Sequence, residues 1–286
     1  MQNVAGQNLS LLKAYSSHLP SKQSMADFTI FCDFDGPLVD VSDRYYSTYQ
    51  LALSDVQAMY HAQGVHLPIS SLSKDQFWQM KRDRLPDVEI AMRSGLRNNQ
   101  IDEFMQQVQA IVNQPALLYQ DALQPGVRWA LALLHAQGAN LVLVTLRCQH
   151  QARQILESYE LAHLFSDIRG TQDIQSAYMN SSQQKAQLLQ SVLSGAPWYG
   201  QLPDNAWMIG DTEADVVAGQ TAGIPTIALT CGIRSKSYLQ RFEPTRIHSD
   251  LLSAAHYLRT YALTTKNPVF GRFLGALRAP KNRPTA

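Results

Sequence analysis

Two short acidic segments carry the residues with the clearest capacity for chemistry. Asp33 and Asp35 come directly after the apolar run 28–32, and Asp211 comes two residues after the apolar run 207–209. Carboxylates that converge from two such turns form a dense negative cluster, which is unfavourable unless protons or a cation compensate it. Because all the ligand atoms are oxygens, the cluster favours a hard cation such as Mg²⁺ over zinc.

The same carboxylates can also act on phosphorus. Asp33 is the candidate nucleophile, and its attack on a phosphate gives an aspartyl-phosphate. Asp35 can protonate the leaving oxygen and then activate water. The alternative interpretation is an ordinary turn with solvated carboxylates, because composition alone produces D-x-D-G in roughly one chain in twenty of this length. The position directly after a buried strand favours the functional interpretation.

Three further residues can complete a phosphate site. Thr145 ends the apolar run 141–144, where its hydroxyl and the next backbone N–H groups can hold phosphate oxygens at a helix start. Lys185 lies at the start of a predicted helix, where the helix dipole does not favour lysine, so an anionic partner is indicated. Asp215 lies one helical turn beyond Asp211. Each also has an ordinary structural interpretation. Thr145 can be a β-favouring residue at a strand end, Lys185 a surface lysine, and Asp215 an acid that the helix dipole favours.

Alternating strands and helices must position these residues. We predict strands at 28–32, 141–144, near Ile168, at 207–209 and at 225–229, and helices at 126–138, 149–160, 183–194 and 214–222. Such alternation predicts an α/β fold with a doubly wound parallel sheet and helices on both faces. Reactive groups in these sheets lie at the carboxyl ends of strands, which is the predicted place of Asp33, Thr145 and Asp211.

Residues 41–121 have a different character, because strand-like runs disappear and apolar residues recur at spacings of three and four. This pattern predicts an inserted all-helical domain. The predicted organisation is an N-terminal arm at 1–27, an α/β core domain at 28–40 and 122–262, the helical domain at 41–121 and a basic C-terminal tail at 263–286.

Composition excludes several classes of function. The chain has 286 residues, 45% of them hydrophobic, which excludes disorder of the whole chain. A formal net charge of +1 gives no global field that would attract nucleic acid. No apolar run reaches the roughly 18 residues of a membrane span. Three scattered cysteines and an N-terminus without a signal-peptide pattern predict a cytoplasmic protein. The tail at 263–286 is predicted to be flexible, with weak association with a membrane surface or a partner as the alternative.

The order of these motifs resembles the haloacid dehalogenase superfamily. The motifs are D-F-D-G at 33–36, Thr145, Lys185 and G-D-T-E-A-D at 210–215. The resemblance spans residues 28 to about 260, and the segments 210–224 and 232–235 are similar to the phosphoglycolate-phosphatase-type members. It implies a Rossmann-like core with residues 41–121 as the helical C1-type cap that covers the site.

The resemblance also implies roles for the acidic residues. Asp33 would be the nucleophile and a metal ligand, and Asp35 would be the acid/base, with its backbone carbonyl on the metal. Asp211 would complete the magnesium site, with Asp215 supporting it. An acid at position 35 favours a phosphate ester over a carbon–halogen or carbon–phosphorus bond, since an alkoxide leaving group needs a proton.

The remaining implied roles concern phosphate and substrate. Thr145 would bind the phosphate, and Lys185 would offset charge on the nucleophile and the phosphate. In the cap, Arg82 and Arg84 can read a substrate carboxylate or a second phosphate, although such arginines more often form exposed helix ion pairs. Pro37 stands where threonine is common in the superfamily, so a supporting hydroxyl is missing.

These observations predict an Mg²⁺-dependent phosphatase that hydrolyses a small-molecule phosphomonoester through an aspartyl-phosphate. One alternative is a phosphomutase, which returns the phosphoryl group to a sugar instead of water. The other is a catalytically inactive protein of the same fold that binds a ligand or a partner. No nucleic-acid partner is expected.

Overall fold

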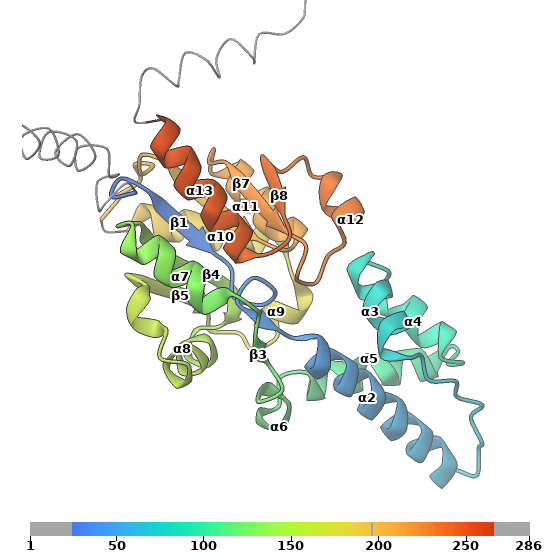
Figure 1. The fold of residues 1–286 in the computed structure, drawn as a ribbon. Coiled ribbons are helices and arrows are strands. Elements are labelled where there is room, and N and C mark those ends of the chain that lie inside the picture. Colours follow the sequence, from blue (N-terminus) through green and yellow to red (C-terminus); the bar gives the residue numbers. More distant parts are fainter. Residues whose placement is uncertain (1–24, 196, 266–286) are drawn as a thin grey trace, which may run out of the picture.

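A six-stranded parallel sheet forms the centre of the molecule, which a computed structural model describes over residues 25–195 and 197–265. The strand order is β5-β4-β1-β6-β7-β8 (Figure 1). The strands are β1 (Thr29–Cys32), β4 (Asn140–Cys148), β5 (Asp167–Thr171), β6 (Ala206–Gly210), β7 (Thr226–Leu229) and β8 (Arg246–His248). Because β1 pairs in parallel with both β4 and β6, the residues that follow these three strands meet at one edge of the sheet.

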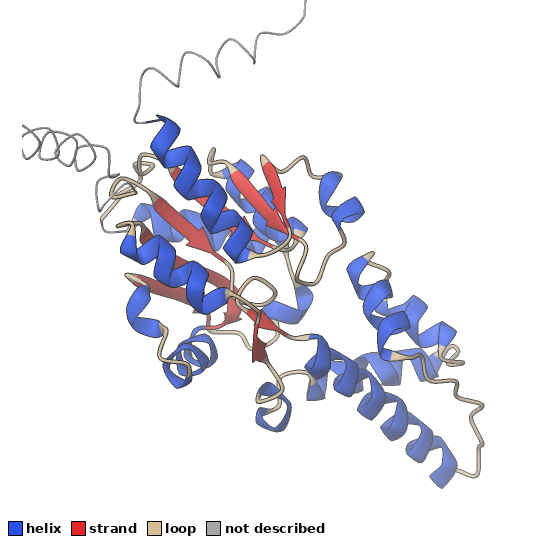
Figure 2. Cartoon of the chain, viewed as in Figure 1, coloured by secondary structure: helices blue, strands red, loops and turns tan. Residues whose placement is uncertain are grey.

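Helices cover both faces of the sheet (Figure 2). The core helices are α7 (Val127–Ala136), α8 (Gln149–Ser158), α9 (Ser176–Met179), α10 (Ser182–Ser194), α11 (Glu213–Thr221), α12 (Lys236–Gln240) and α13 (Leu251–Thr265), with the 3₁₀ helix η1 (Ala162–Leu164). Alternate side chains of β1 enter different hydrophobic clusters: Ile30 packs in the cluster that includes α7 and α13, and Phe31 packs with α10. The predicted doubly wound α/β fold is therefore confirmed.

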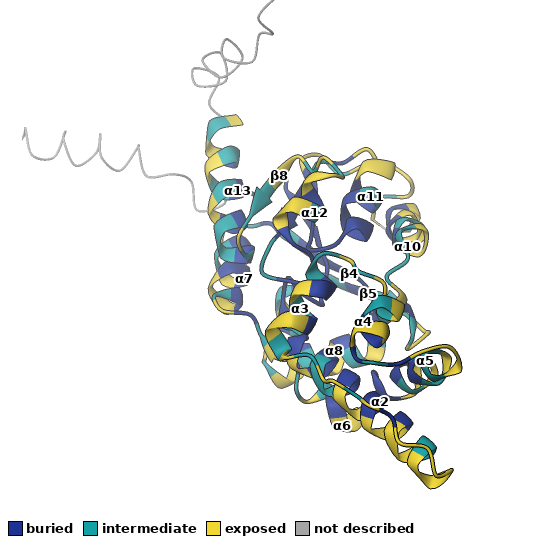
Figure 3. Cartoon of the chain, turned by 90° about the vertical axis from the view of Figure 1, so that its right-hand side faces the viewer, coloured by how far each residue is buried: buried dark blue, intermediate teal, exposed yellow. Residues whose placement is uncertain are grey.

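A separate group of helices follows β1 and lies beyond the edge of the sheet that carries the site (Figure 1). It consists of α2 (Ser42–Ala62), α3 (Lys74–Arg82), α4 (Asp87–Arg93), α5 (Asn99–Ile111) and α6 (Pro115–Leu118). The predicted apolar positions face inward, since Tyr49, Val56 and Phe104 are buried, whereas the far end of α2 is exposed (Figure 3). These helices are the inserted helical cap.

A short antiparallel ribbon joins the cap to the core. Its strands are β2 (Val39–Asp40), on the way into the cap, and β3 (Ala122–Leu123), on the way out. The ribbon was not predicted, because two strands of two residues leave no periodic pattern in the sequence. The two segments that connect the cap to the core therefore lie side by side.

Some predicted features differ from the structure. Thr145 does not end its strand, because β4 continues to Cys148 after an irregularity in its pairing with β5 between Val144 and Cys148. Strand β8 and helix α13 were also not predicted. Most of the predicted arm and nearly all of the basic tail lie outside the described residues. Among the helices at 25–195 and 197–265, none combines the length and hydrophobicity needed to cross a membrane.

Candidate active site

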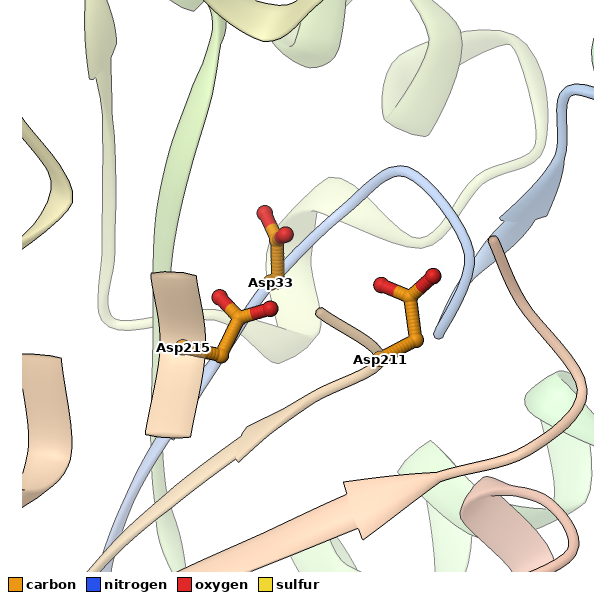
Figure 4. A group of neighbouring side chains, drawn as sticks. All are labelled: Asp33, Asp211 and Asp215. Atoms are coloured by element: carbon orange, nitrogen blue, oxygen red, sulfur yellow. The ribbon is translucent and has the colours of Figure 1, made fainter. Parts of the chain in front are cut away.

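Three carboxylates from different parts of the chain form an acid group at the carboxyl edge of the sheet. Asp33 follows β1, Asp211 follows β6, and Asp215 lies in the first turn of α11. Each offers a carboxylate oxygen, and these oxygens all lie within 4.8 Å of one another (Figure 4). All three residues are buried. The structure thus brings together residues from the two predicted acidic segments. Both oxygens of Asp215 are engaged, one by Lys185 and the other by the backbone N–H and hydroxyl of Thr212.

Two glycines make room for Asp211. A β-carbon at Gly36 or at Gly232 would lie 2.1 Å from Oδ2 of Asp211, which is far inside van der Waals contact. The backbone N–H of Ile233 donates a hydrogen bond to the same oxygen. Asp211 is therefore held by backbone atoms from two loops, and its position depends on the absence of side chains there.

Replacing Gly232 by alanine is expected to displace Asp211 and lower the affinity for Mg²⁺ about 10-fold or more, as loss of support around a metal ligand does. The measurement is an Mg²⁺ titration by calorimetry. Gly195→Ala is the matched control, because a β-carbon there meets nothing closer than 3.5 Å. An unchanged Mg²⁺ affinity in the Gly232→Ala protein would show that Asp211 does not hold the ion.

Lys185 lies between two of these carboxylates. Its Nζ is 2.8 Å from an oxygen of Asp33 and 2.8 Å from an oxygen of Asp215. The side chain is 1% exposed, so the interpretation as a surface lysine is wrong. Burial by itself lowers the pKa of Lys185, but Asp215 and Asp33 outweigh burial and raise that pKa above its usual range. The lysine therefore stays charged.

The acid group carries more negative charge than one lysine can offset. Burial, and then the neighbouring Asp215, raise the pKa of Asp33 to about 7. Burial and the other two carboxylates raise the pKa of Asp211 well above its usual value. Oδ1 of Asp211 is buried and has no hydrogen-bond partner in the described part of the chain. An orphaned buried oxygen in an all-oxygen cluster of excess negative charge fits a hard divalent cation.

Asp33, Asp35 and Thr145 line one small cavity of about 10 Å³ at this edge. Ala177, Asn180, Thr212 and Ile233 complete much of its wall. The hydroxyl of Thr145 is buried and accepts a hydrogen bond from the backbone N–H of Arg147. The cavity holds about one water molecule, so a substrate can enter only after neighbouring segments move apart.

The Asp35 side chain is not part of the acid group and pairs with an arginine. Nε of Arg147 lies 3.0 Å and Nη2 lies 2.6 Å from Oδ1 of Asp35. Nη2 of Arg147 also lies 2.6 Å from Asp121, and Asp121 accepts a hydrogen bond from Arg44 on α2. The sequence pattern did not indicate Arg147, Asp121 or Arg44. Of the three, only Arg147 has a sequence feature that could have indicated a role in the site, because it lies two residues after Thr145.

The two cap arginines do not line the cavity. Nε of Arg84 lies 3.0 Å from Glu213 on α11, and Nη2 of Arg82 donates to the backbone oxygen of Thr230. Both therefore join the cap to the core instead of forming exposed ion pairs within a helix. A substrate-reading role for Arg82 and Arg84 stays a prediction.

A family model for haloacid dehalogenase-like hydrolases matches residues 30–229, which include the acid group, Lys185 and the whole cap. The chain belongs to the haloacid dehalogenase-like hydrolase family. This agrees with the resemblance inferred from the order of the motifs.

Two curated relatives match different shares of this chain. A phosphoglycolate phosphatase from Salmonella typhimurium is 32% identical over 135 residues, which are 46% of this chain and 50% of that protein. The chain thus matches the phosphoglycolate phosphatases over about half their length. A probable phosphatase, IndB from Dickeya dadantii, is 28% identical over 238 residues, which are 82% of this chain and 95% of that protein.

Solved structures share the fold. A haloacid dehalogenase-like hydrolase from Streptococcus pneumoniae superposes with a TM-score of 0.59 at 22% identity, covering 82% of this chain and 99% of that one. A structure titled as a putative beta-phosphoglucomutase from Thermotoga maritima has a TM-score of 0.53 at 16% identity, covering 81% of this chain and 98% of that one. Both therefore share the fold over most of this chain.

Proposed function

We propose that this protein is an Mg²⁺-dependent phosphatase that hydrolyses a small-molecule phosphomonoester through an aspartyl-phosphate on Asp33. The observation that carries the proposal is the pairing of a buried carboxylate with a buried lysine. Asp33 lines the cavity, 2.8 Å from Lys185 and within the acid group. Curated relatives named as phosphatases support the coarser part of the proposal, the hydrolysis of a phosphate ester.

In the first half of the reaction, a carboxylate oxygen of Asp33 forms a bond to phosphorus while the bond from phosphorus to the ester oxygen breaks. Asp35 gives a proton to the departing oxygen. Lys185, which pairs with Asp33, and the Thr145 hydroxyl, on the cavity wall, would contact phosphoryl oxygens and compensate their charge. The product of this half is an aspartyl-phosphate and a free alcohol.

In the second half, water attacks the phosphorus and Asp35 takes the proton from that water. The bond from phosphorus to Asp33 breaks, which releases inorganic phosphate and restores the carboxylate. Asp33, Asp211 and the backbone carbonyl of Asp35 are the groups that would hold Mg²⁺, with Asp215 supporting them through Lys185 and Thr212. When bound, the ion supplies the positive charge that keeps the carboxylates ionised and offsets the charge of the phosphate.

A phosphomutase is the second candidate, since one structure of the same fold is titled as a putative beta-phosphoglucomutase. The two activities differ only in whether water or a sugar hydroxyl accepts the phosphoryl group. Release of inorganic phosphate, measured over a panel of metabolite phosphomonoesters, separates them. We also propose a cytoplasmic location, because all three cysteines are free thiols, which suits a reducing compartment.

Chelation is expected to abolish the activity. After treatment with EDTA, phosphate release should fall by at least about 10²-fold and return when Mg²⁺ is added, because the acid group keeps excess negative charge without a cation. The measurement is phosphate release from an aryl phosphate before chelation, after it, and after Mg²⁺ addition. Full activity in the thoroughly chelated protein would remove the metal from the mechanism.

A further inference from the structure

Four buried charged residues form a closed ring of alternating sign that includes Asp35. Arg147 contacts Asp35 and Asp121, Asp121 contacts Arg44, and Nη2 of Arg44 lies 3.9 Å from Oδ2 of Asp35. Each of the four is less than a tenth exposed. Charges this deeply buried are costly unless they are paired, so the four residues hold one another in a single arrangement.

The contact between Arg147 and Asp35 fixes an orientation. Two nitrogens of Arg147, Nε and Nη2, lie within 3.0 Å of Oδ1 of Asp35, and Nε also lies 3.2 Å from Oδ2. A planar guanidinium that meets a carboxylate at more than one point restricts rotation of that carboxylate, which a single ammonium cannot do. Arg44 makes only one, longer contact with Asp35, at 3.9 Å, so the rotamer of Asp35 depends mainly on where Arg147 lies.

Arg147 is itself held from the cap side of the molecule. Asp121 comes directly before β3, and Arg44 lies on the first cap helix, whereas Asp35 and Arg147 belong to the core. The contact of 2.6 Å between Arg147 and Asp121 thus connects the core with the passage out of the cap, next to the β2–β3 ribbon. Arg44 is also tied to the cap by a hydrogen bond to the backbone oxygen of Val112.

We propose that Arg147 is a positioning residue that aims the Asp35 carboxylate, and that Asp121 holds Arg147 in place when the cap is seated on the core. This inference rests on the proposed function, since it assigns Asp35 the proton transfer to the leaving oxygen. It names a residue outside the predicted site as a determinant of that step.

The test compares two substrates that differ in how strongly departure of the leaving oxygen depends on its protonation. An alkyl phosphate has a strongly basic leaving oxygen, whereas dinitrophenyl phosphate releases its phenolate without protonation. The value of kcat/KM reports the steps up to phosphoryl transfer. For Arg147→Lys and Asp121→Asn, we expect kcat/KM to fall about 10²-fold on the alkyl phosphate and less than about 10-fold on dinitrophenyl phosphate.

The matched control is Arg234→Lys, which makes the same chemical change in another buried contact between core and cap. Because Arg234 pairs with Glu213 and donates to the backbone oxygen of Lys81, without touching Asp35, this variant is expected to change both substrates by the same factor. Equal losses on both substrates in Arg147→Lys and Asp121→Asn would overturn the inference and leave the proposed function intact. A wild-type protein that releases phosphate from neither substrate would instead overturn the proposed function.

A readout independent of activity completes the test. In a crystal structure of the Arg147→Lys protein, the Asp35 carboxylate is expected to leave the orientation that the two-nitrogen contact gives it. An unchanged orientation would show that Arg147 does not aim Asp35, whatever the activity of the protein.

Discussion

Asp33→Asn is expected to lower kcat for phosphate release by at least about 10⁴-fold, with the fold retained. An amide cannot form the aspartyl-phosphate, so the proposed first step is lost. The substitution is nearly isosteric, and it removes one of three neighbouring negative charges, which relieves repulsion in the acid group. The effect should therefore be on the reaction and not on folding.

Turnover of an aryl phosphate measures the loss of activity, and thermal unfolding of the same samples measures whether the fold is retained. Asp43→Asn is the matched control, because it makes the same change in an exposed carboxylate that pairs with Lys74 in the cap. That control should keep wild-type turnover. Near wild-type turnover in the Asp33→Asn protein would show that another residue is the nucleophile.

Lys185→Met is expected to affect both stability and activity. Removing the ammonium leaves Asp33 and Asp215 buried without their partner, and loss of one member of a buried ion pair costs about 3–5 kcal/mol in the free energy of unfolding. Phosphate release should also be lost, because no other side chain in the described part of the chain forms an ion pair with Asp33. Denaturant unfolding and steady-state turnover give the two values.

A double variant separates the two effects of Lys185. In Lys185→Met/Asp215→Asn, one carboxylate charge is removed together with the ammonium, so part of the lost stability should return. Activity should not return, since the lysine is still absent. Lys74→Met, in an exposed cap lysine, serves as the control. A Lys185→Met protein with wild-type stability and turnover would contradict the roles given to this lysine.

The parts of the fold that follow local rules were predictable from the sequence. Continuous apolar runs such as 28–32 and 207–209 mark strands of a buried parallel sheet, and both appear as β1 and β6. Since the carboxyl ends of parallel strands share one edge, the proximity of Asp33 and Asp211 also followed from the pattern. Periodic apolar positions in the cap likewise predicted its long helices.

The arrangement around Asp35 was not predictable in this way. Asp35 and Arg147 are separated by 112 positions, and Arg44 and Asp121 by 77, so no local spacing connects them. Asp121 sits in a linker whose short ribbon has no periodic signal. The extension of β4 past Thr145 depends on an irregular pairing with β5, which is a property of two strands together and not of one segment.

Identifying the phosphorylated residue tests the central claim most directly. The protein is mixed with an excess of an aryl phosphate and Mg²⁺, quenched in acid within the first turnovers, and digested for mass spectrometry. We expect one phosphoryl group on the peptide that contains Asp33 and Asp35, with fragmentation that assigns it to Asp33. A phosphoryl group on any other residue would contradict the mechanism. So would turnover in which no phosphorylated protein accumulates, even in the Asp35→Asn variant, where hydrolysis of the aspartyl-phosphate is slowed.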